Sequence, residues 1–472
     1  MPANIMTSIM NSLDIIYSWI WGAPLLVLLT GLGIYLTITL RGLQFRYLGY
    51  ALRLVFGSQK AHPEAEGQGD ISHFQSLMTA LAATIGIGNI AGVATAITVG
   101  GLGALFWMWV TALLGMATKY AEAILAVKYR VTDEHGEMCG GPMYFIESGL
   151  GWKWLACSFA FFGAVAALGG GNMLQANSVA DVMRTMFHVN PWWSGLIIAA
   201  LTGFTIVGGI KSIGKVAGLL VPFMALFYIA GASIILAYHY DRILDVIVAI
   251  ITHAFTGQAA FGGFLGSTML LALRVGVSRG LMTSEAGLGT ASIAAAAAKT
   301  DLPGRQALVS MTGSFLATII MCSVTGLVLG VTGVFGSLDE QGKLLNGASM
   351  TVAAFNSIFT GGGYIVTIGL VLFAFTTLLG WAYYGEKCVE YLFGIKSVPI
   401  YRVLFTLMII PGAVLELDIV WKISDVFNGL MAFPNLIGLC ALSSVVISET
   451  KLFLNVLKAE REAEKEAKLI SK

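Results

Sequence analysis

Long apolar runs separated by short polar segments recur from one end of this 472-residue chain to the other. A run of about 20 apolar residues is long enough to cross the hydrocarbon core of a bilayer as a helix. The pattern therefore predicts an all-α polytopic membrane protein with about eleven transmembrane helices. The expected helices lie at about 19–40, 73–101, 104–127, 154–183, 192–210, 216–239, 264–297, 306–333, 363–385, 398–420 and 425–447.

Two of these runs contain glycines that interrupt a helical pattern. In the first run, Gly86 and Gly88 each weaken a helix by roughly 1 kcal/mol relative to alanine. The second run, 262–298, would be roughly 55 Å long as one helix, far beyond a hydrocarbon core of about 30 Å, and it contains Gly276 and Gly280. Backbone groups freed in hydrocarbon must be satisfied by protein or by a lined cavity. Broken helices at corresponding positions of two halves predict the binding site of a secondary transporter.

The distribution of lysine and arginine predicts how the chain is oriented. These residues gather in one alternating set of connecting segments, so the N-terminus is expected outside and the C-terminus in the cytoplasm of a cell, with a multi-pass membrane location. We expect a transporter domain at 1–450 and a cytoplasmic tail at 451–472. Within the domain, an extra helix at about 19–40 precedes two five-helix inverted repeats, at about 73–239 and 264–447.

Composition narrows the class further. The chain is 57% hydrophobic and 11% charged, whereas soluble domains have about 25% charged residues. A net charge of +1 gives no reason to expect a nucleic-acid partner. The five cysteines form no CxxC pair, so the sequence suggests neither a disulfide framework nor a zinc site. No nucleophile–base pair is evident in the apolar runs, which argues against a membrane enzyme. The sequence also gives no sign of an obligate protein partner.

Polar side chains at the first break and in the fourth run are candidate ligands. Asn89 directly follows Gly88 and is too polar for a lipid-facing position, although glycines alone can also serve close helix packing. Asn172 and Gln175 are three residues apart and share a helix face. They could bond to a neighbouring helix or contact the substrate.

The ninth run offers a possible ion site. Thr376 and Thr377 are adjacent, and Trp381 lies one turn beyond Thr377. Hydroxyls in membrane helices often bond back to their own helix, but two neighbouring hydroxyls can also coordinate sodium. The seventh run carries Arg274, Arg279 and Glu285, for which an internal ion-pair lock and substrate contact are both open.

Several segments resemble the alanine or glycine:cation symporter family, and the similarity spans essentially the whole chain. The segments are GDISHFQ at 69–75, ALAATIGIGNIAGVA at 80–94, FWMW at 106–109, MATKYAE at 116–122, GGPMY at 140–144 and GLMTSEAGLG at 280–289. The resemblance implies sodium-coupled uptake of alanine, glycine or similar small neutral amino acids. It also implies the inverted-repeat fold of the bacterial leucine transporter, with one additional N-terminal helix.

The resemblance also implies roles for individual residues. Gly86, Ile87, Gly88 and Gly276 would offer backbone groups to the amino acid. From the residues themselves, we add Thr84, Asn172, Gln175, Thr377 and Trp381 as candidate substrate contacts. The co-transported sodium would bind near Ile85, Asn89, Thr376 and Thr377. A proton-coupled carrier with Glu285 as its titrating group is the main alternative. A channel is a weaker one, because channels usually build symmetric filters from repeated subunits.

Overall fold

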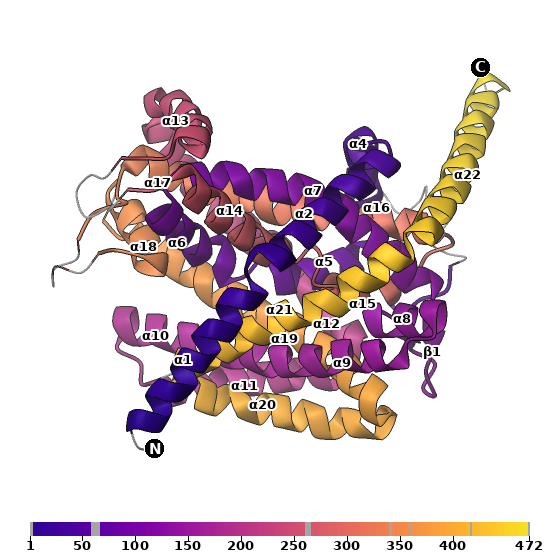
Figure 1. Ribbon diagram of the computed structural model, residues 1–472, viewed down its shortest axis with the longest axis horizontal. Coiled ribbons are helices and arrows are strands. Elements are labelled where there is room, and N and C mark those ends of the chain that lie inside the picture. The colour runs from indigo at the N-terminus through magenta and orange to yellow at the C-terminus, as the bar shows by residue number, and fades with distance from the viewer. Residues whose placement is uncertain are drawn as a thin grey trace.

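The chain folds into a bundle of long helices (Figure 1). This computed structural model describes residues 3–57, 67–259, 266–338, 342, 344–358, 360–415 and 418–470. The helices up to the middle of the chain are α1 (Ala3–Ile20), α2 (Ala23–Thr39), α3 (Leu43–Arg46), α4 (Leu48–Phe56), α5 (His73–Thr84), α6 (Ala91–Gly100), α7 (Gly103–Lys128), α8 (Pro142–Leu150), α9 (Lys153–Leu168), α10 (Leu174–Phe187), α11 (Pro191–Val207), α12 (Gly209–Tyr238) and α13 (Ile243–Thr256).

The remaining α-helices are α14 (Met269–Ser284), α15 (Thr290–Ala296), α16 (Pro303–Ser314), α17 (Ser323–Thr332), α18 (Gly347–Asn356), α19 (Gly363–Phe393), α20 (Val398–Val414), α21 (Asp418–Ala441) and α22 (Ser443–Ile470). Short 3₁₀ or π segments are η3 (Ile87–Asn89), η4 (Gly169–Met173), η5 (Tyr240–Arg242), η6 (Phe315–Cys322) and η7 (Ile395–Ser397). The strands β1 (Val131–Thr132) and β2 (Met138–Cys139) form one antiparallel hairpin.

The expected all-helical membrane architecture is confirmed. Among the described residues, eight helices are long and apolar enough to cross a membrane, and α6 and α11 are shorter apolar helices. These eight correspond to eight of the eleven expected runs. The other three are α11 and the two runs that contain the breaks. The count of eleven spans and the inverted repeat remain predictions, as do the domain boundaries.

Local sequence signals set where the broken helices begin. Ser72 and Gln75 form a capping box at the start of α5, since each side chain bonds to the other residue's backbone N–H. Thr268 caps α14 by accepting from the N–H of Leu271 at 3.2 Å. Such caps satisfy backbone donors that have no partner inside the helix. Both broken helices are therefore anchored at their first turn.

The first break separates α5 from α6. The N–H of Gly86 donates to the carbonyl of Thr84 and to Oδ1 of Asn89, both at 3.1 Å, in place of the helical bond to Ala82. Asn89 also donates to the carbonyl of Ala317 in η6 at 2.8 Å. The amide side chain therefore holds the break open and attaches it to the neighbouring π-helical segment.

The second break separates α14 from α15 and is held from a different helix. Glu285 ends α14 with a positive φ of 51°, and Gly287 and Gly289 have φ values of 90° and 83°. Oε1 of Glu122, in α7, accepts from the N–H groups of Gly287 at 2.9 Å and Gly289 at 3.2 Å. It also accepts from the amide of Asn435 at 2.7 Å. A buried carboxylate thus replaces the helical partners that these N–H groups have lost.

The position of the second break corrects one expectation. Gly276 was expected to offer backbone groups to the substrate, but α14 runs unbroken through it and ends eight residues later. The glycine serves close packing instead, because a Cβ there would overlap the backbone of Ala104 and would lie 2.6 Å from Cβ of Trp107. The break lies at 285–289, where the chain has two positive-φ glycines.

The two chain ends flank the bundle. Helices α1 and α2 form a rod along one face; α21 crosses the bundle, and α22 continues from it and projects beyond the bundle (Figure 1). Helix α22 begins at Ser443, earlier than the expected tail at 451. Its Phe453 is only 1% exposed and packs on Gly304, and its Glu460 pairs with Arg305 at 2.7 Å. The first half of the tail is thus bound to the body of the protein.

Candidate functional site

A cavity of about 270 Å³ lies between the two breaks. This volume is near the lower end of about 300–1,000 Å³ for small-molecule sites. The cavity is bounded by the two broken helices, by α10, α19 and α21, and by the junction of α1 with α2. It is lined by Trp21, Ala83, Thr84, Gly86, Ile87, Gly88, Ala91, Gly92, Thr95, Gly170, Leu174, Gln175, Arg279, Met282, Thr283, Glu285, Leu288, Thr377, Trp381, Ser424, Asp425 and Asn428.

Most of the residues predicted to bind substrate lie in this one wall. The structure brings together residues from α5, η3, α10 and α19 that are up to three hundred positions apart in sequence. They are Thr84, Gly86, Ile87, Gly88, Gln175, Thr377 and Trp381. The wall is tight where Trp381 meets η4, because a Cβ on Gly171 would overlap the Trp381 side chain.

Asn172 and Gly276 are not part of the wall. Asn172 is fully buried, and its amide donates to the carbonyl of Phe405 in α20 at 2.6 Å. Of the two roles that the sequence left open for Asn172, the structure shows the bond to a neighbouring helix. Gly276 faces α7 within the continuous part of α14.

Oxygen atoms of α5 and α19 converge beside the first break. The carbonyl of Phe373 accepts from Oγ1 of Thr376 at 3.0 Å and from Oγ1 of Thr377 at 2.8 Å. The Thr377 hydroxyl also lies 3.1 Å from the carbonyl of Ala82, which has lost its helical partner. In the part of the chain that the structure describes, the carbonyl of Ile85 receives no hydrogen bond. Carbonyl and hydroxyl oxygens at a helix C-terminus form a suitable environment for a cation.

The remaining residue predicted to bind sodium is engaged elsewhere. Both ends of the Asn89 amide are used in holding the break, through Gly86 on one side and Ala317 on the other. Asn89 is completely buried and is absent from the cavity wall. Its structural role is therefore to shape the site rather than to line it.

The charged residues of the seventh run divide between the wall and its surroundings. Glu285 is 3% exposed, lines the cavity, and accepts from the hydroxyls of Thr84 at 3.2 Å and Thr290 at 3.1 Å. Arg279 also lines the cavity, whereas Arg274 lines a neighbouring one. The bond between Thr84 and Glu285 therefore links the first broken helix to the second.

Several wall residues were missed by sequence reasoning. Ser424, Asp425 and Asn428 of α21 line the cavity, and the side-chain oxygens of Ser424 and Asn428 have no hydrogen-bond partner among the described residues. The sequence did contain a signal for α21, because Ser424 and Asn428 are four residues apart and place two polar side chains on one face of an apolar helix. Trp21 had no such signal, since a tryptophan near the end of an apolar run is typical of a membrane interface.

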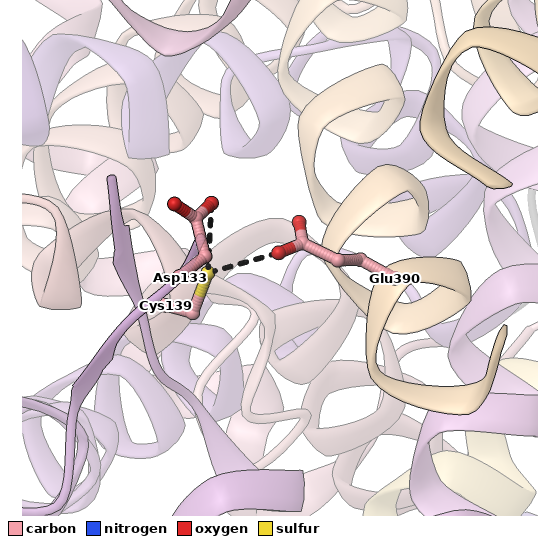
Figure 2. Close-up of side chains that lie close together, drawn as sticks. All are labelled: Asp133, Cys139 and Glu390. Carbon is pink, nitrogen blue, oxygen red and sulfur yellow. Dashed lines mark hydrogen bonds between the residues drawn. The ribbon is translucent and has the colours of Figure 1, made fainter. Parts of the chain in front are cut away.

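A second cluster of polar groups lies away from the cavity, where the β1–β2 hairpin meets α19 (Figure 2). Sγ of Cys139 lies 3.2 Å from Oε1 of Glu390 and 3.8 Å from Oδ2 of Asp133, a grouping that resembles a metal site. However, Nζ of Lys387 lies 2.8 Å from Glu390, 3.2 Å from Cys139 and 3.7 Å from Asp133. The ammonium group already supplies the positive charge that a metal would bring. Burial raises the pKa of the Cys139 thiol to about 12, so it remains protonated.

The fold is shared with solved transporters. A structure of MhsT in complex with L-phenylalanine aligns with a TM-score of 0.58 at 15% sequence identity, covering 81% of this chain and 93% of that one. Two broken helices that enclose a central cavity within such a bundle define a secondary transporter.

The chain belongs to the sodium:alanine symporter family, which matches residues 6–467. It is 55% identical to the sodium/alanine symporter AgcS of Methanococcus maripaludis, over 96% of this chain and 98% of that protein. It is 34% identical to the probable sodium/glutamine symporter GlnT of Bacillus subtilis, over 94% of this chain and 90% of that protein. The family confirms the predicted function, a sodium-coupled amino-acid symporter in the membrane and not an enzyme.

Proposed function

We propose that this protein carries alanine, glycine or a similarly small neutral amino acid into the cell together with sodium, and that both bind at the break between α5 and α6. The observation that carries the proposal is the cavity between two broken helices, with oxygen atoms of α5 and α19 converging at its edge. One end of the break suits a cation and the other suits a carboxylate.

The amino acid would lie with its carboxylate toward η3 and the start of α6. Helix α6 begins at Ala91, and both Ala91 and Gly92 line the cavity. The first N–H groups of a helix lack partners inside it and favour an anion. The side chain would then face Trp381, whose indole leaves little room beyond a small substituent. The side-chain oxygen of Gln175, which has no hydrogen-bond partner among the described residues, is available to the ammonium group.

Sodium would bind among the carbonyls of Ala82, Ile85 and Phe373 and the hydroxyls of Thr376 and Thr377. Its entry provides enough energy for accumulation. One sodium ion moving down 100 mV releases about 2.3 kcal/mol, and a tenfold gradient adds about 1.4 kcal/mol. Together they sustain a substrate gradient on the order of several hundred-fold. In the membrane, the N-terminus would lie outside and the C-terminus in the cytoplasm, with the two five-helix repeats in opposite orientation.

Uptake into proteoliposomes tests the proposal. Labelled alanine is offered under an inward sodium gradient, an inward potassium gradient, or a proton gradient in sodium-free buffer. Of these three conditions, only the inward sodium gradient is expected to drive alanine uptake above its equilibrium level. Full uptake driven by protons without sodium would assign the energy coupling to a titrating group, for which the two carboxyls of the cavity wall, Glu285 and Asp425, are the candidates.

A further inference from the structure

A second cavity of about 300 Å³ lies directly beside the first. Three residues, Trp21, Thr95 and Arg279, line both cavities, so they form the partition between them. The second cavity also contains Arg274, an arginine inside an apolar helix that lines no part of the first cavity. Charged residues inside a membrane-spanning segment are expensive and usually mark the path of a polar solute.

Trp21 reaches this partition because the N-terminal rod bends there. Trp21 and Gly22 form the turn between α1 and α2, and Pro24 in the first turn of α2 has no N–H to continue the preceding helix. The bend brings a residue of the extra helix, which lies outside the two expected repeats, into the wall of the substrate cavity. Trp21 is 7% exposed, whereas Trp19 on the same rod is 76% exposed.

The indole of Trp21 is attached to α21. Its Nε1–H donates to the carbonyl of Asp425 at 2.8 Å. It packs against Gly429, where a Cβ would lie 3.1 Å from the Trp21 Nε1. The ring therefore lies between two cavities, with its Nε1–H bonded to α21 and open volume on either side of it.

From these contacts we infer that Trp21 is a movable barrier between the substrate cavity and the second cavity, and that amino acids pass this barrier as they enter or leave. The inference rests on the proposed binding of the amino acid in the first cavity. It assigns a role in substrate retention and selection to the additional N-terminal helix. The arginines of the second cavity would attract the carboxylate of an arriving amino acid.

The test compares three purified variants with the unchanged protein in detergent and in proteoliposomes. Trp21→Ala removes the ring, Trp21→Phe keeps a ring but removes the N–H, and Trp19→Ala is the matched control on the same rod. Each is loaded with labelled alanine in sodium, and the release of alanine is followed after dilution into unlabelled alanine at constant sodium. Competition by leucine is measured in parallel.

Trp21→Ala is expected to release alanine about tenfold faster, the effect of losing an interaction of ordinary hydrogen-bond strength together with the ring contact. It should also let leucine compete where the unchanged protein excludes it. Trp21→Phe should release alanine faster but still exclude leucine, and Trp19→Ala should match the unchanged protein.

Release and selectivity equal to those of Trp19→Ala, in a Trp21→Ala protein that elutes as a single folded species, would overturn the inference. If Trp21→Ala does not fold, Trp21→Phe decides by its release rate alone. Failure of the unchanged protein to bind alanine in sodium is a different outcome. It would overturn the proposed function and not the role of Trp21.

Discussion

The hydroxyl of Thr377 is the point at which the proposed ion site can be tested most sharply. Oγ1 of Thr377 lies 2.8 Å from the carbonyl of Phe373 and 3.1 Å from that of Ala82. Thr377→Val keeps the branched shape and removes only this oxygen. Phe373 keeps the helical N–H of residue 377, but Ala82 is left with a buried carbonyl that has no donor. Such a group costs about 1–3 kcal/mol.

That cost falls on the stability of the sodium-free protein, whereas the loss of the Thr377 oxygen as a ligand falls on sodium binding. Removing one oxygen ligand worth about 1–3 kcal/mol raises the sodium concentration for half-maximal alanine uptake by roughly 5- to 150-fold. Uptake by Thr377→Val in proteoliposomes is measured against sodium concentration. Thr79→Val is the matched control, because Thr79 is also buried, on α5, and its hydroxyl donates to the carbonyl of Gln75 in its own helix at 2.8 Å. Equal half-maximal sodium concentrations in the two variants would refute the placement of sodium at Thr377.

Two further outcomes follow from the wall and from the hairpin. Trp381→Ala should let valine and leucine compete with alanine, with a gain in apparent affinity of about 10- to 200-fold per methylene accommodated. An unchanged order of competitors in a folded variant would show that Trp381 serves packing and does not select the substrate. The Cys139 thiol, with its pKa raised to about 12, should react with maleimide at pH 8 on the order of a thousandfold more slowly than an ordinary thiol, and faster as the pH rises, because only the thiolate reacts. The test uses a variant in which the other four cysteines are replaced by alanine, so that Cys139 is its single cysteine. The control is the same variant after unfolding, and equal rates before and after unfolding would contradict the burial of Cys139.

The positions of the long helices were predictable from sequence because a bilayer imposes a length. Helices α7, α12 and α19 each coincide with an apolar run of more than 20 residues. Helices α8, α13 and α18 were not expected, since they have only 9, 14 and 10 residues. Hydropathy over a span-length window does not register elements that short.

The first break was predictable because its cause is local. Gly86, Gly88 and Asn89 all lie within four positions, and the capping amide of Asn89 is in the sequence next to the glycines that need it. The role of Asn89 was harder to predict, because an amide beside a break can either bind an ion or complete the backbone hydrogen bonds. The structure shows the second arrangement, with the amide bonded to Gly86 and to Ala317.

The second break was misplaced because its cause is not local. Glycine spacing favoured the region of Gly276, yet that glycine faces Ala104 and lets two helices approach. What opens the chain at Gly287 is the carboxylate of Glu122, 165 positions earlier in the sequence. A buried carboxylate is stable only when several donors surround it, and here the donors are the very N–H groups that the break releases. The carboxylate and the break therefore require each other, which explains why neither could be assigned from its own segment of the sequence.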